Sequence, residues 1–272
     1  MTVIEAPRPP ERVIFQRPEL LTDVSSHYCP GCGHGIIHRL IAELLEELDL
    51  GARTIAVAPV GCSVFAYEYL AIDWVEAPHG RAPAVATGIR RVRPDAFVLT
   101  YQGDGDLAAI GTAEIVHAAA RGEPISGIFV NNGIYGMTGG QMAPTTLLGQ
   151  RTTSSPTGRE SGLAGFPIQI TEMLALLPGV AYAARGSVAD PSHIGKTKAM
   201  IKRAFGAQLN GEGFALVEVL SNCPVGWNMT APESMAHLAT VSETYPLGVL
   251  VDRARGVVPS VTPAGEHRGK EA

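Results

Sequence analysis

The sequence predicts a single α/β domain, doubly wound around a mainly parallel sheet. Three observations lead to this prediction: short apolar runs alternate with helix-like stretches, glycine-rich segments follow several of the runs, and the composition suits one large core. Apolar residues make up 46% and charged residues 17% of the 272 residues, which excludes wholesale disorder. Strands that alternate with helices pair in parallel and place ligands at their carboxyl ends.

Buried strands are predicted where several apolar residues run together between turn residues. Such runs occupy residues 53–59, 96–102, 125–131 and 214–220. Helices are predicted between them from the spacing of apolar side chains, as in the series Ile36, Leu40, Leu44 and Leu48. The predicted helices span residues 35–48, 83–92, 107–121 and 193–205.

The domain is expected to span residues 20–250, with an extended N-terminal arm over 1–19 and a C-terminal tail over 251–272. Residues 136–166 consist almost entirely of glycine, serine, threonine, proline and amide residues. A loop of this length inside a compact domain is usually functional, so we expect it to cover a site.

The charge and the apolar pattern exclude two classes of protein. The chain has 26 acidic and 21 basic residues, a net charge of −5, which argues against a basic nucleic-acid surface. No apolar run reaches the roughly 18 residues that a membrane helix needs, and the start of the chain lacks the pattern of an export signal. We therefore expect a cytoplasmic protein whose four cysteines are reduced, and either bind metal or are buried.

Polar segments follow two of the predicted strands. Gly-Asp-Gly-Asp at 103–106 joins a strand to a helix, and Asn-Asn-Gly at 131–133 follows the next strand. The N-terminus of a helix attracts phosphate, and carboxylates beside phosphate need a bridging cation, for which Mg²⁺ is the natural candidate. Either segment alone is also a common turn signal. Together they predict a phosphate and magnesium site.

The four cysteines fall in three separate segments. Cys29 and Cys32 form a C-x₂-C loop, whereas Cys62 and Cys223 each follow a predicted strand. Segments that end strands or begin helices can converge at one edge of the sheet. Four thiolates bind a [4Fe–4S] cluster or a structural zinc, and one pair joined by two distant single cysteines favours the cluster. Alternatively, Cys62 and Cys223 are small buried hydrophobic residues.

Five motifs give the chain a specific resemblance: CPGCGHG, VGCS, HGRAPAVATGIR, GDGDLAAIGTAEIVHAAARG and NNGIYGMTGGQMAPTT. With them, roughly residues 20–230 closely resemble the β subunit of 2-oxoacid:ferredoxin oxidoreductases, and GDG followed by NN resembles the thiamine diphosphate motif. The resemblance implies thiamine diphosphate, Mg²⁺ and one [4Fe–4S] cluster. It places the cluster on Cys29, Cys32, Cys62 and Cys223, and Mg²⁺ on Asp104, Asn132 and the carbonyl of Ile134.

The same resemblance implies a set of residues that bind the cofactor. The set comprises Gly61, Ser63, His79, Gly103, Asp104, Gly105, Asp106, Asn132, Ile134, Tyr135 and Thr138. His79 is the predicted catalytic residue, bonded to diphosphate or substrate; alternatively it is an ordinary surface-loop histidine. His27 and His38 are further candidates, and His34 either contacts the cofactor or caps a helix.

The activity implied is oxidative decarboxylation of a 2-oxoacid to acyl-CoA and CO₂, with electrons passing through the cluster to ferredoxin. The 272 residues contain no second αβ domain to activate the aminopyrimidine and no cysteines for a second cluster. We therefore expect an α subunit and ferredoxin, or a ferredoxin-like subunit, as partners. Met137 stands where pyruvate-specific members carry asparagine, and its neighbours are neutral, so a branched-chain 2-oxoacid is expected, with 2-oxoglutarate next.

Two other functions fit parts of the pattern. A non-redox thiamine diphosphate-dependent decarboxylase or synthase would use the four cysteines for a structural zinc, and would be colourless and active without an electron acceptor. A binding or scaffold protein with a vestigial site would not bind thiamine diphosphate in a Mg²⁺-dependent way.

Overall fold

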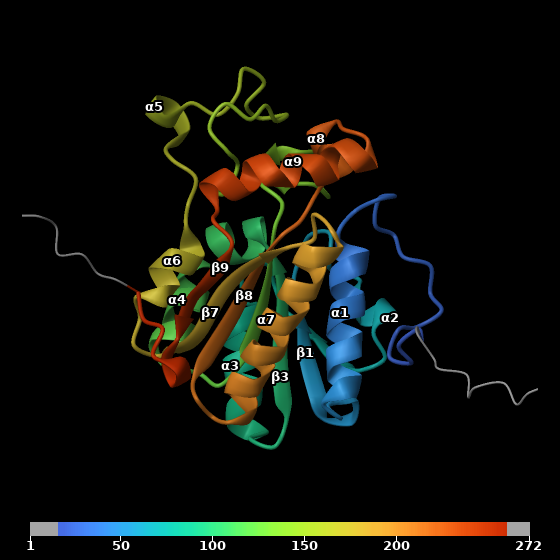
Figure 1. Ribbon diagram of the computed structural model, residues 1–272, viewed down its shortest axis with the longest axis vertical. Helices are drawn as coiled ribbons and strands as arrows, with labels where there is room; N and C mark the ends of the chain where they lie inside the picture. Colours follow the sequence, from blue (N-terminus) through green and yellow to red (C-terminus); the bar gives the residue numbers. More distant parts are fainter. Residues whose placement is uncertain (1–15, 260–272) are drawn as a thin grey trace, which may run out of the picture.

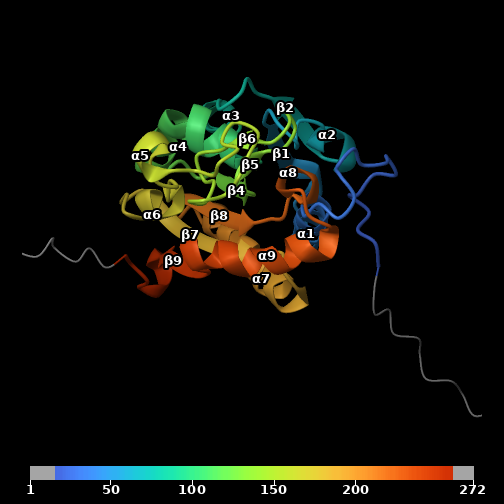
Figure 2. The same cartoon turned by 90° about the horizontal axis from the view of Figure 1, so that it is seen from above.

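A seven-stranded sheet with helices on both faces forms the centre of the computed structural model, which describes residues 16–259 (Figures 1 and 2). The strand order is β2-β1-β3-β4-β8-β7-β9, and all neighbours are parallel except β7 and β9. The four predicted strands are confirmed as β1 (Thr54–Ala58), β3 (Phe97–Gly103), β4 (Ser126–Asn131) and β8 (Phe214–Leu220). The doubly wound α/β class is therefore confirmed.

Three strands of this sheet were not expected from the sequence. They are β2 (Asp73–Glu76), β7 (Val180–Ser187) and β9 (Gly248–Asp252). β2 and β9 are edge strands with exposed positions, so they lack a continuous apolar run. β9 also takes in the first two residues of the expected tail. The rest of that tail from residue 260, and residues 1–15 of the expected arm, lie outside the described residues.

Helices cover both faces of the sheet, and a separate apolar cluster lies between the sheet and the helices on each face. On one face α1 (His34–Glu47), α7 (Pro191–Leu209) and α9 (Ala231–Thr244) contribute buried residues such as Ile41, Phe205 and Leu238. On the other face α3 (Ala82–Val92), α4 (Thr112–Ala120) and α6 (Ile170–Ala175) contribute residues such as Ala86, Ile115 and Leu174. Figure 2 shows these two layers above and below the sheet.

The helix expected over 107–121 is divided at Gly111 into a π-helical segment, Gly105–Ile110, and α4. A Cβ at Gly111 would lie 2.5 Å from the carbonyl oxygen of Gly80 and 2.7 Å from that of Asp106. Gly80 itself has φ +79° and packs its backbone against Gly111. This close approach brings the loop after β2 against the start of the helix that follows β3.

Residues 136–166 have more structure than the expected loop. They include β6 (Gln141–Met142), which pairs with β5 (Ile134–Tyr135), and a short helix, α5 (Ser161–Ala164). The Arg159 guanidinium holds the segment together, because it donates to backbone carbonyls both before and after it in the sequence. The acceptors are those of Ala143, Pro144, Thr146, Ala164, Gly165 and Phe166. In Figure 1 α5 projects beyond the end of the sheet.

The remaining short elements are α2 (Ala66–Tyr69), α8 (Pro224–Trp227) and two 3₁₀ turns, Gly51–Arg53 and Arg253–Arg255. Within residues 16–259, none of the helices combines the length and the apolar character that crossing a bilayer requires.

Candidate functional site

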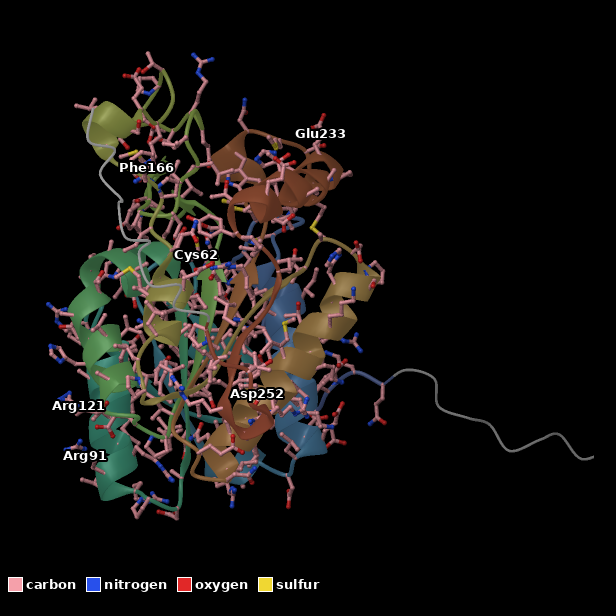
Figure 3. All side chains as sticks on the ribbon, turned by 60° about the vertical axis from the view of Figure 1, so that its left-hand side comes forward. Cys62, Arg91, Arg121, Phe166, Glu233 and Asp252 are labelled. Atoms are coloured by element: carbon pink, nitrogen blue, oxygen red, sulfur yellow. The ribbon has the colours of Figure 1, made fainter. Side chains whose placement is uncertain are left out.

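The loops that follow the parallel strands meet at one edge of the sheet. Cys62 follows β1, Asp104 follows β3, Asn132 follows β4 and Cys223 follows β8. Figure 3 shows Cys62 near the end of the sheet from which the segment with Phe166 projects, while Arg91 and Arg121 lie toward the opposite end. This edge is where a parallel sheet binds ligands.

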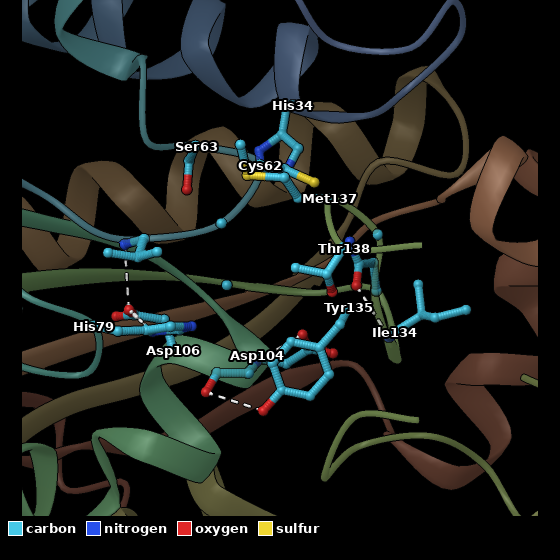
Figure 4. Close-up of a pocket in the computed structure, with 16 residues that line it drawn as sticks. His34, Cys62, Ser63, His79, Asp104, Asp106, Ile134, Tyr135, Met137 and Thr138 are labelled. Atoms are coloured by element: carbon cyan, nitrogen blue, oxygen red, sulfur yellow. Dashed lines mark hydrogen bonds and ion pairs between the residues drawn. The ribbon is translucent and has the colours of Figure 1, made fainter. Parts of the chain in front are cut away.

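All eleven residues that the resemblance assigned to the cofactor line one cavity at this edge (Figure 4). They come from the loops after β1, β2, β3 and β4 and from the start of the long segment. The cavity is also lined by residues outside that set: His34, Val60, Cys62, Gly136 and Met137. The structure therefore brings the sequence-predicted cofactor residues together, and their roles remain predictions.

Asp104 is a buried carboxylate tied to the loop after β4. One oxygen accepts from the N–H of Gly105 at 2.8 Å, and the other accepts from the N–H of Gly133 at 2.8 Å and the Thr145 hydroxyl at 2.5 Å. Burial raises the pKa of Asp104 to about 6, although these hydrogen bonds oppose the shift. A buried carboxylate with a raised pKa is stabilised in its charged form by a cation. Thr145 has no signal in the sequence beyond its place in the motif that ends in APTT.

The turn after β4 supplies two more oxygen atoms of the kind that Mg²⁺ binds. The Asn132 amide oxygen accepts from the N–H of Ile134 at 3.2 Å, and the Ile134 carbonyl accepts from the N–H of Gly136 at 3.0 Å. Gly133, at the turn, has φ +67°, a conformation that favours glycine. The donor set of carboxylate, amide and carbonyl therefore fits a magnesium ion.

Asp106 has both oxygens engaged within the protein. Its Oδ1 accepts from His79 Nδ1 at 2.6 Å, from the N–H of Gly80 at 2.9 Å and from the N–H of Val60 at 3.3 Å, and its Oδ2 accepts from Gln102 at 2.5 Å. The carboxylate thus joins the loops after β1 and β2 to β3. Because Asp106 accepts a hydrogen bond from Nδ1, the other ring nitrogen of His79 is left for a ligand in the cavity that His79 lines.

Of the three further candidate histidines, His34 and His38 lie beside this cavity on α1, whereas His27 lines a second cavity, described below. His34 lines the first cavity, and its Nδ1 lies 2.6 Å from the Tyr101 hydroxyl. The Tyr28 ring stacks on His34 at 4.5 Å, and its hydroxyl lies 3.1 Å from His38 Nε2. Burial lowers the pKa of both His34 and His38 to about 3, so both are neutral imidazoles. His34 does not cap α1 through its side chain; the N-cap residue is Gly33.

The four cysteines surround a second cavity that adjoins the first. The sulfur atoms of Cys223 and Cys62 lie 3.2 Å and 3.4 Å from the point that a Cβ at Gly136 would occupy. A Cβ at Gly226 would lie 2.8 Å from the Cys223 sulfur, so side chains at these two glycines would intrude on the sulfur-lined space. Among residues 16–259, no group of three or more His, Cys, Asp or Glu side chains is arranged to hold a metal ion. A four-iron cluster is larger than an ion, and a cavity lined by thiols on glycine-rich loops fits it.

Burial, together with the neighbouring thiols, raises the pKa of Cys62 to about 11 and that of Cys223 to about 12. Backbone hydrogen bonds oppose the shift, from Met137 to Cys62 and from Gly226 to Cys223. Thiolates at these positions would therefore depend on nearby positive charge, which bound iron supplies, and on N–H donors. Gly136, Gly226 and Met137 gave no signal as cluster neighbours, because they approach the cysteines only in the folded chain.

The two cavities share a wall. Cys62, Asn132, Gly136 and Met137 line both of them. A ligand at the Asp104 side and a group held by the cysteines would therefore be separated by single side chains.

The chain matches a family model and several known proteins. Residues 55–219 match the C-terminal TPP-binding domain of thiamine pyrophosphate enzymes. The chain is 46% identical over 249 residues, 91% of its length, to ketoisovalerate oxidoreductase subunit VorA of Methanothermobacter thermautotrophicus, of which it covers 52%. It is 39% identical over 198 residues to 2-oxoglutarate synthase subunit KorB of Methanocaldococcus jannaschii, covering 72% of this chain and 69% of that one.

Among solved structures, the 2-oxoglutarate:ferredoxin oxidoreductase from Magnetococcus marinus superposes with a TM-score of 0.73 and 26% identity, covering 89% of this chain and 87% of that chain. The chain spans about half the length of the ketoisovalerate relatives that it matches. From the family model, the subunits and this structure together, the chain belongs to the thiamine pyrophosphate enzymes, as a β-type subunit of the 2-oxoacid:ferredoxin oxidoreductase family.

Proposed function

We propose that the chain is the thiamine- and cluster-binding subunit of an oxidoreductase that converts a branched-chain 2-oxoacid and coenzyme A to acyl-CoA and CO₂. Electrons pass through a [4Fe–4S] cluster on this chain to ferredoxin. The observation that supports this most directly is the shared wall of the two cavities, Cys62, Asn132, Gly136 and Met137. A site that must both decarboxylate and remove electrons needs its two cofactors in such proximity.

In this proposal Asp104, Asn132 and the Ile134 carbonyl would hold Mg²⁺, which would supply positive charge to offset the negative charge of the diphosphate. The start of the Gly105–Ile110 helical segment lines the same cavity, and the N-terminal end of a helix suits an anion. His79, oriented by Asp106, would offer its remaining ring nitrogen to the diphosphate or the substrate. Thiamine diphosphate, when bound, supplies the carbanion chemistry that releases CO₂ from a 2-oxoacid.

Cys29, Cys32, Cys62 and Cys223 hold the cluster. Asn222 supports this site from outside the cavity, because its amide donates to the carbonyl of Gly31 at 2.9 Å and so ties the C-x₂-C loop to the segment before Cys223. Cys29 is exposed, which provides an electron exit toward ferredoxin at the surface of this chain.

The substrate class is supported by the cavity lining and by the relatives. Among the described residues that line the first cavity, none is Lys or Arg, so this lining offers neither cation for the distal carboxylate of 2-oxoglutarate. The apolar side chains of Val60, Ile134 and Met137 lie there instead. A ketoisovalerate subunit is also more similar in sequence to this chain than the 2-oxoglutarate subunit reported above.

An α subunit is the partner in this proposal, because the relatives reported above are subunits of larger enzymes and the aminopyrimidine of thiamine needs a carboxylate from a second αβ domain. Ferredoxin or a ferredoxin-like subunit accepts the electrons. Each partner is testable by isolating the chain with the subunits that accompany it.

Anaerobic purification followed by iron, sulfide and zinc analysis tests the proposal. Iron and sulfide in near-equal amounts, with Mg²⁺-dependent binding of thiamine diphosphate, are expected. Zinc without iron, in a colourless protein active without an acceptor, would instead support the decarboxylase or synthase alternative. For the substrate, turnover of 2-oxoisovalerate with coenzyme A and ferredoxin should exceed that of 2-oxoglutarate, and a clear preference for 2-oxoglutarate would refute the branched-chain assignment.

A further inference from the structure

Trp227 connects the loop that carries Cys223 to the turn that carries Asn132. It is the last residue of α8, and its backbone N–H donates to the carbonyl of Cys223 at 2.9 Å, one helical turn earlier. Its indole Nε1–H donates to the carbonyl oxygen of Asn132 at 2.9 Å. The contact spans 95 residues of sequence and joins the ends of two neighbouring strands, β4 and β8.

The peptide group that Trp227 contacts is held from both ends. The Asn132 carbonyl accepts from the indole, and the N–H of the same peptide group, that of Gly133, donates to Asp104 at 2.8 Å. This peptide group lies between two of the proposed magnesium ligands, the Asn132 amide and the Ile134 carbonyl. Its orientation therefore fixes the backbone from which both of those oxygen atoms project.

The packing around α8 reinforces this connection. A Cβ at Gly226, the residue before Trp227, would lie 3.1 Å from a methyl carbon of Ile134 and 2.8 Å from the Cys223 sulfur. Close packing of this kind leaves α8 little freedom to shift independently of the turn after β4.

We propose that Trp227 is a positioning residue for the magnesium site: its indole N–H fixes the Asn132–Gly133 peptide, and its place one turn after Cys223 makes that orientation depend on the cysteine loop. The inference rests on the proposed function, because it assumes that Asp104, Asn132 and Ile134 bind Mg²⁺. It adds that the loop of a cluster cysteine sets the affinity of the diphosphate site.

Replacing Trp227 by phenylalanine removes the N–H donor and leaves the Asn132 carbonyl without that partner. Trp74 offers a matched control, because its indole also donates to a backbone carbonyl, that of Leu70 at 3.2 Å, but it lies on β2 and lines neither cavity. The readout is isothermal titration of thiamine diphosphate at a series of Mg²⁺ concentrations, with iron content measured on the same samples. The chain is purified anaerobically with its accompanying subunits.

Trp227→Phe should bind thiamine diphosphate about tenfold more weakly, as expected for a lost hydrogen bond that leaves a carbonyl unpaired. It should also need more Mg²⁺ for half-saturation, while its iron content stays at the wild-type level. Trp74→Phe should match the wild type in all three. A purely structural role would lower iron and affinity together and would not move the Mg²⁺ requirement of the iron-replete protein.

Wild-type affinity and Mg²⁺ requirement in iron-replete Trp227→Phe would overturn the inference. If that variant loses its iron, Trp227→Tyr, which fills more of the indole volume, is judged by the same criteria. Loss of iron in both variants would also overturn it, because Trp227 would then be needed for folding. Failure of the wild type itself to bind thiamine diphosphate with Mg²⁺ would instead refute the proposed function.

Discussion

Gly136→Ala tests whether the cysteine cavity holds a cluster. The added methyl group would lie 3.2 Å from the Cys223 sulfur and 3.4 Å from the Cys62 sulfur. Favourable contacts between heavy atoms lie at about 3.5–4.0 Å, so both sulfurs would have to withdraw by a few tenths of an ångström. Gly136 is not at a positive φ, so the backbone itself tolerates alanine.

The cost of the substitution depends on what the cavity contains. With thiols alone, the two side chains can shift, and overpacking costs about 1–3 kcal/mol at most. With a cluster, both sulfurs are bonded to iron and the methyl group competes for the space beside it. We therefore expect the iron and sulfide content to fall several-fold, and the brown colour with it, while the free energy of unfolding of the iron-free protein falls by no more than this overpacking cost.

The assay compares anaerobically purified Gly136→Ala with Gly35→Ala. Gly35 lies on the exposed side of α1, where a Cβ would meet no atom within 4 Å, so alanine should keep the iron and raise helix stability by roughly 0.5–1 kcal/mol. Full iron content in Gly136→Ala, with an unchanged visible spectrum, would refute the placement of a cluster between Cys62 and Cys223.

Three further predictions concern charged groups. Burial raises the pKa of Asp104 from 3.8 to about 6, so the metal-free protein should lose roughly 3 kcal/mol of unfolding free energy through this group as the pH rises from 4 to 8. Urea titrations of Asp104→Asn should lack this loss. Mg²⁺-dependent binding of thiamine diphosphate should instead weaken as the pH falls below about 6, because the carboxyl becomes protonated. Arg185→Met removes the cation bonded at 2.7 Å to the buried Glu218, and should cost about 3–5 kcal/mol; an unchanged urea midpoint would contradict this. Asp106→Asn takes the charged acceptor from His79, and should weaken thiamine diphosphate binding about tenfold, which calorimetry would contradict if the affinity were unchanged.

The sequence predicted the centre of the fold better than its edges. β1, β3, β4 and β8 are buried along most of their length and read as continuous apolar runs. β7 escaped prediction although it is fully buried, because it contains Arg185, whose charge is satisfied by Glu218 on the adjacent strand and Glu172 on α6. That pairing is visible only after the strands are placed side by side.

The candidate site was also predicted only in part from the sequence. Residues within the motifs, from Gly61 to Thr138, were assigned to the cofactor by the family resemblance, and they line one cavity where the strand ends of the parallel sheet converge. Two contacts that complete the site could not be predicted, although Thr145 lies within a motif: Thr145 reaches Asp104 across 41 residues, and Trp227 reaches Asn132 across 95. Such contacts depend on loop geometry, which local sequence does not determine.

Arg159 has a consequence for engineering. Its guanidinium donates to backbone carbonyls at both ends of a segment of more than twenty residues. The conformation of the whole segment therefore depends on one side chain within it. Exchanging short pieces of this segment between related enzymes would break the hydrogen bonds of Arg159. Transferring residues 143–166 as one unit would keep both those bonds and the loop conformation that they stabilise.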